Sequence, residues 1–180
     1  MSKYFPDAHN FSYQTDVETP CSICKTVGIC FDAGGYYGSN EIECICENCL
    51  AKGALIELDI ETNEISHEEL SKFLTEEEAN ELGNEIVYKT PALPTWQDRD
   101  WPIVNQEVCT FIKIADKHDF STKVEFKDSF IEHYQTGTDF DWLWEMLPNE
   151  KITNYKNGNY DVSIYLFKNS KGIHCTWDAN

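Results

Sequence analysis

The pattern of apolar and polar positions predicts helices in the middle of the chain. Ser66 and Thr75 are each followed three residues later by a glutamate, which is the capping-box pattern of a helix start. After Thr75, one helical face carries the apolar residues Ala79, Leu82, Ile86 and Val87. We therefore expect helices to begin near residues 66 and 75, with the acids after Thr75 placed favourably against the helix dipole.

The second half of the chain predicts both helices and strands. We expect a short helix within residues 123–135, and another over 139–147 that Thr138 caps and Pro148 ends. Strands are predicted over residues 108–114, 160–167 and 173–177. The intervening Lys168–Gly172 predicts a turn that joins the last two strands into a β-hairpin.

Two stretches predict irregular structure. Residues 1–20 form an arm interrupted by prolines, and the aromatic side chains in it indicate that it packs against the rest of the protein. The segment Lys89–Pro102 contains three prolines and excludes a regular helix or central strand. Its tryptophans, Trp96 and Trp101, either pack in the core, which is the ordinary arrangement, or form part of a recognition surface.

The spacing of the cysteines predicts a metal site. Cys21 and Cys24 form one C-x-x-C pair, and Cys46 and Cys49 form a second about twenty residues later. This spacing is typical of a structural zinc site in which each pair forms a knuckle and four thiolates complete a tetrahedron. Disulfides and redox-active thiols are the alternatives. Of the remaining cysteines, Cys30 is expected to pack in the interior and Cys44 to compete as a ligand only as a lesser alternative.

These elements together predict an α+β protein. We expect an irregular arm over residues 1–20, a zinc-ribbon-like four-cysteine module over residues 21–60, and an α+β domain over residues 61–180. The domain would pack on the module and end in the β-hairpin. Such a zinc ion would organise the fold, because four protein ligands leave no coordination position for water or substrate.

The charge of the chain restricts its partners. Its 180 residues include 32 acidic and 14 basic side chains, for a net charge of −18 at pH 7. This field repels phosphate backbones, so direct nucleic-acid binding is disfavoured, and it attracts a basic protein partner. Solubility alone is the other interpretation of the charge.

The sequence also predicts where the protein resides. Residues 1–6 lead into a polar stretch instead of the apolar run of a signal peptide, and no apolar stretch is long enough to cross a membrane. We expect a cytoplasmic protein that does not bind membranes, because a reducing compartment favours thiolate–metal chemistry over disulfides.

No catalytic constellation is recognisable, and we expect a protein that is not an enzyme. The motifs of zinc hydrolases and zinc deaminases are missing from the sequence. For Cys109 and Cys175 the sequence establishes no histidine partner, because it does not bring His118, His133 or His174 beside either thiol in the fold. Asp139 and Asp141 beside Trp142 and Trp144 could imitate a carbohydrate site, but a capped amphipathic helix is the better interpretation.

The ordered motifs resemble the CbrC family of small bacterial proteins from about Thr19 onward. The resemblance is carried by Cys21/Cys24, Gly34–Tyr37, Cys46/Cys49, Lys89–Pro91, Trp96–Gln97, Trp101, Cys109–Phe111 and Tyr165–Lys168. Two departures stand out: Asn169–Gly172 replaces a further C-x-x-C pair of the family, and Val104–Gln106 replaces a His-Cys pair. Functions that need those thiols are therefore not expected here.

The family resemblance implies an association with tolerance to a DNase colicin. Together with the charge, it predicts an acidic immunity or tolerance factor that binds a basic toxin of the nuclease bacteriocin type. The candidate contacts are Glu76, Glu77, Glu78, Glu81, Glu85, Trp96, Trp101, Asp139, Asp141 and Glu145. A zinc-ribbon regulator that contacts nucleic acid or the transcription machinery is the alternative. It would require basic residues near the knuckles, where the sequence offers Lys25 and Lys52 and little else.

Overall fold

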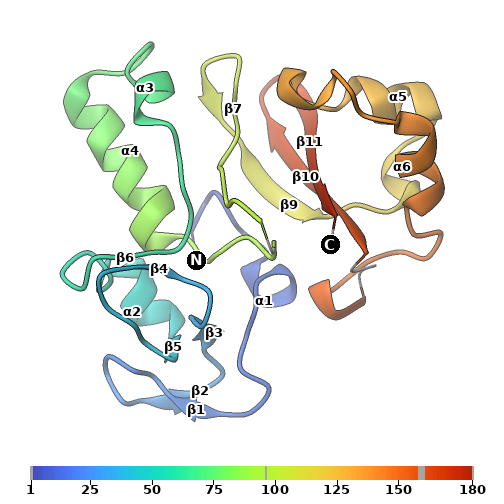
Figure 1. Cartoon of the computed structure of the whole chain (residues 1–180). Helices are drawn as coiled ribbons and strands as arrows, with labels where there is room; N and C mark the ends of the chain where they lie inside the picture. Colours follow the sequence, from blue (N-terminus) through green and yellow to red (C-terminus); the bar gives the residue numbers. More distant parts are fainter. Residues whose placement is uncertain (1, 96, 158–160, 180) are drawn as a thin grey trace.

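The computed structural model describes residues 2–95, 97–157 and 161–179 (Figure 1). The elements up to residue 89 are α1 (Ala8–Phe11), β1 (Thr19–Pro20), β2 (Val27–Gly28), β3 (Phe31–Asp32), β4 (Tyr37–Gly38), β5 (Cys44–Ile45), α2 (Glu47–Ala51), β6 (Ile60–Glu61), α3 (His67–Leu70) and α4 (Glu76–Lys89). The later elements are β7 (Ile103–Val104), β8 (Glu107–Val108), β9 (Thr110–Ile114), η1 (Lys117–Asp119), α5 (Lys123–Asp128), η2 (Glu132–Tyr134), α6 (Phe140–Met146), η3 (Tyr155–Asn157), β10 (Val162–Asn169) and β11 (Gly172–Ala179).

The centre of the fold is an antiparallel sheet in the order β11-β10-β9. Strands β10 and β11 form the predicted C-terminal hairpin, which confirms the α+β class. The turn is tighter than the sequence predicts, because Asn169 pairs with Gly172 and leaves two residues between the strands. Gly172 has a φ of 143°, a conformation that favours glycine. Tyr160, the first residue of the strand predicted over residues 160–167, lies outside the described residues.

The sheet separates two hydrophobic clusters, because β10 is buried on both faces. Val162, Ile164 and Leu166 point to one side, where α5 and α6 cover the sheet (Figure 1). Tyr165 and Phe167 point to the other side and join the cluster that contains the cysteines. The cluster that contains the cysteines packs the N-terminal half of the chain against the sheet. The boundaries expected after residues 20 and 60 stay predictions.

The N-terminal arm is tied to the sheet, as its aromatic residues predict. Phe5 and Phe11 are buried, and the ring of Phe5 meets that of Phe111 edge-on at 4.7 Å between centroids. The amide of Phe111 donates to the carbonyl of Tyr4 at 2.8 Å. Within residues 2–20 the arm is irregular apart from the single turn of α1, the short strand β1 and an isolated bridge from Gln14 to Phe31.

The helix starts near residues 66 and 75 form as the sequence predicts. Thr75 caps α4 with both bonds of a capping box: its hydroxyl accepts from the amide of Glu78, and the Glu78 carboxylate accepts from the amide of Thr75. At α3, Ser66 accepts from the amide of Glu69, whereas the Glu69 carboxylate pairs with Lys72 instead of completing the box. Ala79 and Ile86 bury the inner face of α4.

The boundaries of the later elements differ from the predictions. The strand expected over residues 108–114 is interrupted at Cys109, which separates β8 from β9. The helix expected within residues 123–135 ends at Asp128. Asp139 caps α6 in place of Thr138, since its carboxylate accepts from the amides of Asp141 and Trp142. After Lys89, which ends α4, the described residues of the proline segment are irregular, apart from a single bridge between Asp100 and Glu64.

Candidate metal centre

The first cysteine pair lies in a tight loop at the end of a short hairpin. Pro20 of β1 pairs with Val27 of β2, so the six residues 21–26 form the loop. The amide of Cys21 donates to the carbonyl of Thr26 at 3.0 Å, and that of Lys25 donates to the carbonyl of Cys21 at 2.9 Å. Lys25 takes a φ of 62°, which closes the loop at the cost of a strained backbone. This pair forms the predicted knuckle.

The second pair lies at the start of a helix, and the expectation of a second knuckle is wrong. Cys46 follows β5 directly and is the N-cap of α2, and Cys49 lies in the first turn of that helix. A C-x-x-C spacing fits a helical turn as well as a knuckle, since residues three apart share a helix face. The module thus combines a knuckle with a helix instead of the two knuckles of a zinc ribbon.

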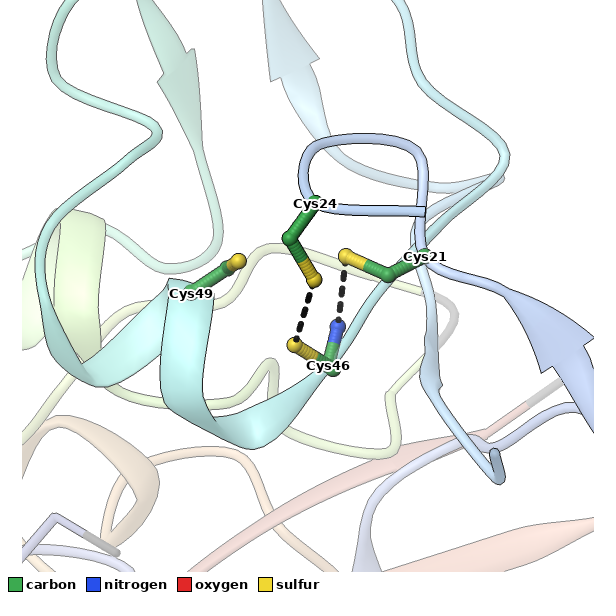
Figure 2. Close-up of side chains that lie close together, drawn as sticks. All are labelled: Cys21, Cys24, Cys46 and Cys49. Atoms are coloured by element: carbon green, nitrogen blue, oxygen red, sulfur yellow. Dashed lines mark hydrogen bonds between the residues drawn. The ribbon is translucent and has the colours of Figure 1, made fainter. Parts of the chain in front are cut away.

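Backbone contacts bring the two pairs together. The amide of Ser22 donates to the carbonyl of Cys44 at 3.1 Å, and the amide of Cys44 donates to the hydroxyl of Ser22 at 3.2 Å. The amide of Cys46 donates to Sγ of Cys21 at 3.3 Å (Figure 2). Strand β5 therefore holds the start of α2 against the knuckle.

The four sulfur atoms converge as a set of metal ligands would. All four lie within 4.8 Å of one another, and Sγ of Cys24 is 3.7 Å from Sγ of Cys46 (Figure 2). Zn–S bonds of about 2.3 Å imply a tetrahedral edge of roughly 3.8 Å between sulfurs, whereas a disulfide requires about 2.05 Å. All eight cysteines are free thiols. The donor set fits a closed four-thiolate metal site.

The electrostatics of the cluster favour thiolates on one side of it. Hydrogen bonds from the side chain and backbone of Thr26 lower the pKa of Cys24 to about 6. At Cys49 the opposite holds, because burial and the neighbouring sulfurs raise the pKa of its thiol. Four adjacent thiolates repel one another, so a bound cation is needed for all four to ionise together.

The remaining cysteines lie outside this cluster. Cys44 points its thiol at the carbonyl of Pro20, 3.5 Å away, and Cys30 points its own at the carbonyl of Thr19. Both are buried, as are Cys109 and Cys175. The clustered set within the described residues is therefore Cys21, Cys24, Cys46 and Cys49, and Cys44 has no place in it.

Some acidic side chains of α4 are free on the surface, whereas others are buried in part or bonded within the helix. Glu76, Glu77 and Glu81 are exposed and line one shallow depression along the helix. In the described part of the chain, none of these three forms an ion pair. Glu78 is held by the capping box, and Glu85 is half-buried.

The acids of α6 are partly used within the fold. Asp139 caps the helix, and Asp141 pairs with Lys123 at 2.7 Å. Glu145 is exposed. Asp139 and Asp141 therefore already have partners within the protein, and a bound protein would compete with these contacts.

Of the two tryptophans in the proline segment, the structure describes only Trp101. Trp96 lies outside the described residues. Trp101 is buried, its indole N–H donates to the carbonyl of Cys109 at 2.7 Å, and its ring meets that of Phe167. Core packing, the ordinary arrangement for Trp101, is what the structure shows. Because this side chain is not on the surface, we remove Trp101 from the candidate contacts with a protein partner.

Two pockets beside the proline segment have no counterpart in the sequence interpretation. One, of about 380 Å³, is lined by residues that include Asp98, Asp100, Tyr134 and Trp177. The other, of about 430 Å³, is lined by residues that include Tyr36, Tyr37 and Arg99. The signal available in the sequence is the alternation Asp98-Arg99-Asp100, because an extended chain sends such side chains to opposite sides.

The comparisons with known proteins identify the family. A model of the Uncharacterised protein family (UPF0167) matches residues 1–178. The chain belongs to this family. UPF0167 is also known as the CbrC family, which the sequence motifs resemble, and the match extends through the N-terminal arm that those motifs do not cover.

The comparison with solved structures and the search for membrane-spanning helices both gave negative results. No solved structure matches the chain. In the described part of the chain, no helix combines the length and the apolar composition that crossing a bilayer requires.

Proposed function

We propose that the cysteine cluster holds one structural Zn²⁺ ion. The support is the all-sulfur donor set and the 3.7 Å separation of Cys24 and Cys46, which suits the edge of a tetrahedron of thiolates. With four protein ligands the ion would fix the knuckle to the start of α2. It would not activate water, because no coordination position is left for it.

We further propose that the protein has a binding function without catalysis, and that its partner is a basic protein. The observation that carries this proposal is the set of exposed, unpaired carboxylates on α4 in a chain of net charge −18. Such a face attracts a basic surface over a long range and speeds association at low salt. The pocket lined by Asp98 and Asp100 adds carboxylates that suit a lysine or arginine side chain.

The most specific form of the proposal is an immunity or tolerance factor. The CbrC resemblance implies an association with tolerance to a DNase colicin, and nuclease surfaces are basic because they bind phosphates. An acidic protein can cover such a surface by charge complementarity. The proposed partner is therefore the basic nuclease domain of a bacteriocin, bound in the cytoplasm.

Calorimetric titration of a colicin DNase domain into the zinc-loaded protein tests this function. We expect binding that weakens as salt concentration rises, because exposed charges are screened. The variant Glu76→Gln/Glu77→Gln/Glu81→Gln should bind more weakly and with a smaller salt dependence. The matched control Glu41→Gln/Glu43→Gln/Glu57→Gln removes the same charge from other exposed positions and should retain most of the affinity.

Two results would count against this proposal. Absent or salt-insensitive binding would reject a basic partner of this type. Equal weakening by both triple variants would reject α4 as the contact surface, because only the total charge would then matter.

A further inference from the structure

Arg99 is the sole arginine of the chain, and it is buried. Its side chain is 6% exposed and lines the pocket of about 430 Å³. The other walls come from the Gly34–Tyr37 loop, from Tyr13 and Asp32, and from Ala92 and Thr95. This pocket is separate from the four clustered cysteines, none of which lines it.

The guanidinium of Arg99 is incompletely satisfied by the protein. Nη1 donates to the carbonyl of Thr62 at 3.3 Å, and Nε is buried without a hydrogen-bond partner among the described residues. The rings of Tyr37 and Tyr36 lie 5.2 Å and 5.9 Å from Cζ. These contacts leave most of the five N–H donors of a guanidinium unused. Burial of a charge in this way is costly unless something pairs with it.

No carboxylate among the described residues supplies that pairing. The described part of the chain contains no ion pair to Arg99. The adjacent Asp98 and Asp100 line the other pocket, as alternation along an extended segment dictates. Asp32 lines the same pocket as Arg99, but its Oδ1 accepts from the amide of Gly34 at 2.8 Å. Within residues 2–95, 97–157 and 161–179, this buried cation thus has no ion-pair partner, although the protein is strongly acidic.

The Gly34–Tyr37 loop is shaped around this cation. A Cβ atom on Gly35 would lie 2.6 Å from Nη2 of Arg99, so the backbone approaches the guanidinium as closely as glycine allows. Burial raises the pKa of Tyr36, whose hydroxyl therefore stays neutral. Tyr37 is 46% exposed and leaves one face of the pocket open to solvent.

We propose that this pocket binds a small aromatic monocarboxylate, with the carboxylate on Arg99 and the ring against Tyr36 and Tyr37. The planar guanidinium matches a carboxylate through paired hydrogen bonds, and this match is strongest where water is excluded. The tyrosine walls suit a flat apolar body, and the volume lies in the range of small-molecule sites. A single positive charge amid acidic surroundings favours a monoanion over phosphate.

The proposal goes beyond the binding of a basic partner, and the chemistry of the two ligands is opposite. A basic partner is attracted by the carboxylates of α4 and of the Asp98 pocket. The carboxylate ligand would be recognised by the one buried cation. Either activity can therefore fail without the other.

The test is titration of isotope-labelled, zinc-loaded protein with benzoate, followed by amide chemical shifts in NMR spectra. We expect saturable shifts at the Gly34 and Gly35 amides. Benzamide, the neutral isostere, should produce none, because it lacks the charge that Arg99 would pair with. Inorganic phosphate should compete weakly or not at all.

Matched variants separate binding from folding. Arg99→Met should weaken benzoate binding by about tenfold or more, the effect of losing charge-assisted hydrogen bonds. Lys151→Met removes one positive charge from an exposed position outside the pocket and should leave binding unchanged. Tyr37→Leu alters an exposed wall, so the fold should persist while the affinity falls severalfold.

A folded Arg99→Met variant with unchanged affinity would overturn the proposal, as would a lack of saturable shifts at millimolar benzoate. Equal binding of phosphate or benzamide would also reject it.

Discussion

Cys24 is the residue whose substitution best distinguishes a structural metal site from hydrophobic packing, because only a metal site predicts a large loss of stability there. It is exposed, whereas Cys21 and Cys49 are buried, so its side chain contributes little to the hydrophobic core. Its sulfur nevertheless lies 3.7 Å from that of Cys46. If a metal joins these sulfurs, an exposed position becomes one of the most sensitive in the chain.

We predict that Cys24→Ser strongly destabilises the protein, since it removes one of four metal ligands. A hundredfold loss of metal affinity corresponds to about 2.7 kcal/mol of stability at saturating metal. Urea unfolding of the zinc-loaded protein measures this loss. The control Val27→Ala, an exposed position in the same hairpin, should change stability by no more than about 0.5 kcal/mol. If the two variants are equally stable, Cys24 is not a ligand.

Individual residues also show how far the sequence can be interpreted. The four cysteines were predicted from spacing alone, because C-x-x-C pairs restrict which sulfurs can converge. Arg99 was not predicted, since a lone arginine in a proline-rich loop is ordinarily solvated. Its burial depends on Tyr36, Tyr37 and Gly35, which are more than sixty residues away in the sequence. Trp101 had two interpretations, and its burial against Phe167 was decided by tertiary packing.

At the scale of elements, local signals predicted which segments are helix or strand better than where they end. The capping box at Thr75 and the strand signal over residues 160–167 depend on neighbouring residues, and both are present in the fold as α4 and β10. The second cysteine pair is on a helix instead of a knuckle because its spacing suits both. Similarly, Thr138 and Asp139 are both good caps, and the structure uses Asp139.

One buried carboxylate connects several elements around β9. Asp116 is fully buried and accepts from Lys113 Nζ at 2.6 Å, from the amide of His118 at 2.9 Å and from that of Ile152 at 2.8 Å. Burial opposes its ionisation, but these donors prevail and lower its pKa below the ordinary value of 3.8. The ionised form therefore stabilises the end of β9, the start of η1 and the chain near residue 152.

We predict that Asp116→Asn lowers the free energy of unfolding by about 3 kcal/mol at pH 7. Lys113 would keep only Asp119 as an ion-pair partner, and the amides of His118 and Ile152 would lose a charged acceptor. The folded pKa is lowered, so this contribution is fully present above pH 3.8 and is lost as pH falls through the folded pKa. The difference from the natural protein should thus shrink in strong acid. Urea unfolding at several pH values measures it. The exposed control Asp128→Asn should have little effect at any pH, and equal stability of both variants at pH 7 would contradict the role of Asp116.

On the scale of the whole molecule, one sheet separates two hydrophobic clusters. The cluster on the helical side is built from residues between 112 and 179. The other combines the arm, the cysteine module and the far face of β10, which the sequence cannot show because these contacts span most of the chain. The C-terminal hairpin and the α+β class were predictable because they depend on local pattern.

The small strands around the cysteines depend most on the proposed metal. Strands β1 to β6 have two residues each and form only two-stranded pairs, apart from an isolated bridge between Phe31 and Gln14. Short pairs of this kind are marginal in water without a further link. Four ligands from the knuckle and the start of α2 would supply that link, as structural zinc does in small modules.

The most direct measurement of the central claim is the metal content of the purified, unsupplemented protein by inductively coupled plasma mass spectrometry. One zinc ion per chain is expected, with the Cys24→Ser/Cys49→Ser variant containing little. A folded natural protein with no bound metal, or a double variant that retains the full content of zinc, would contradict the account.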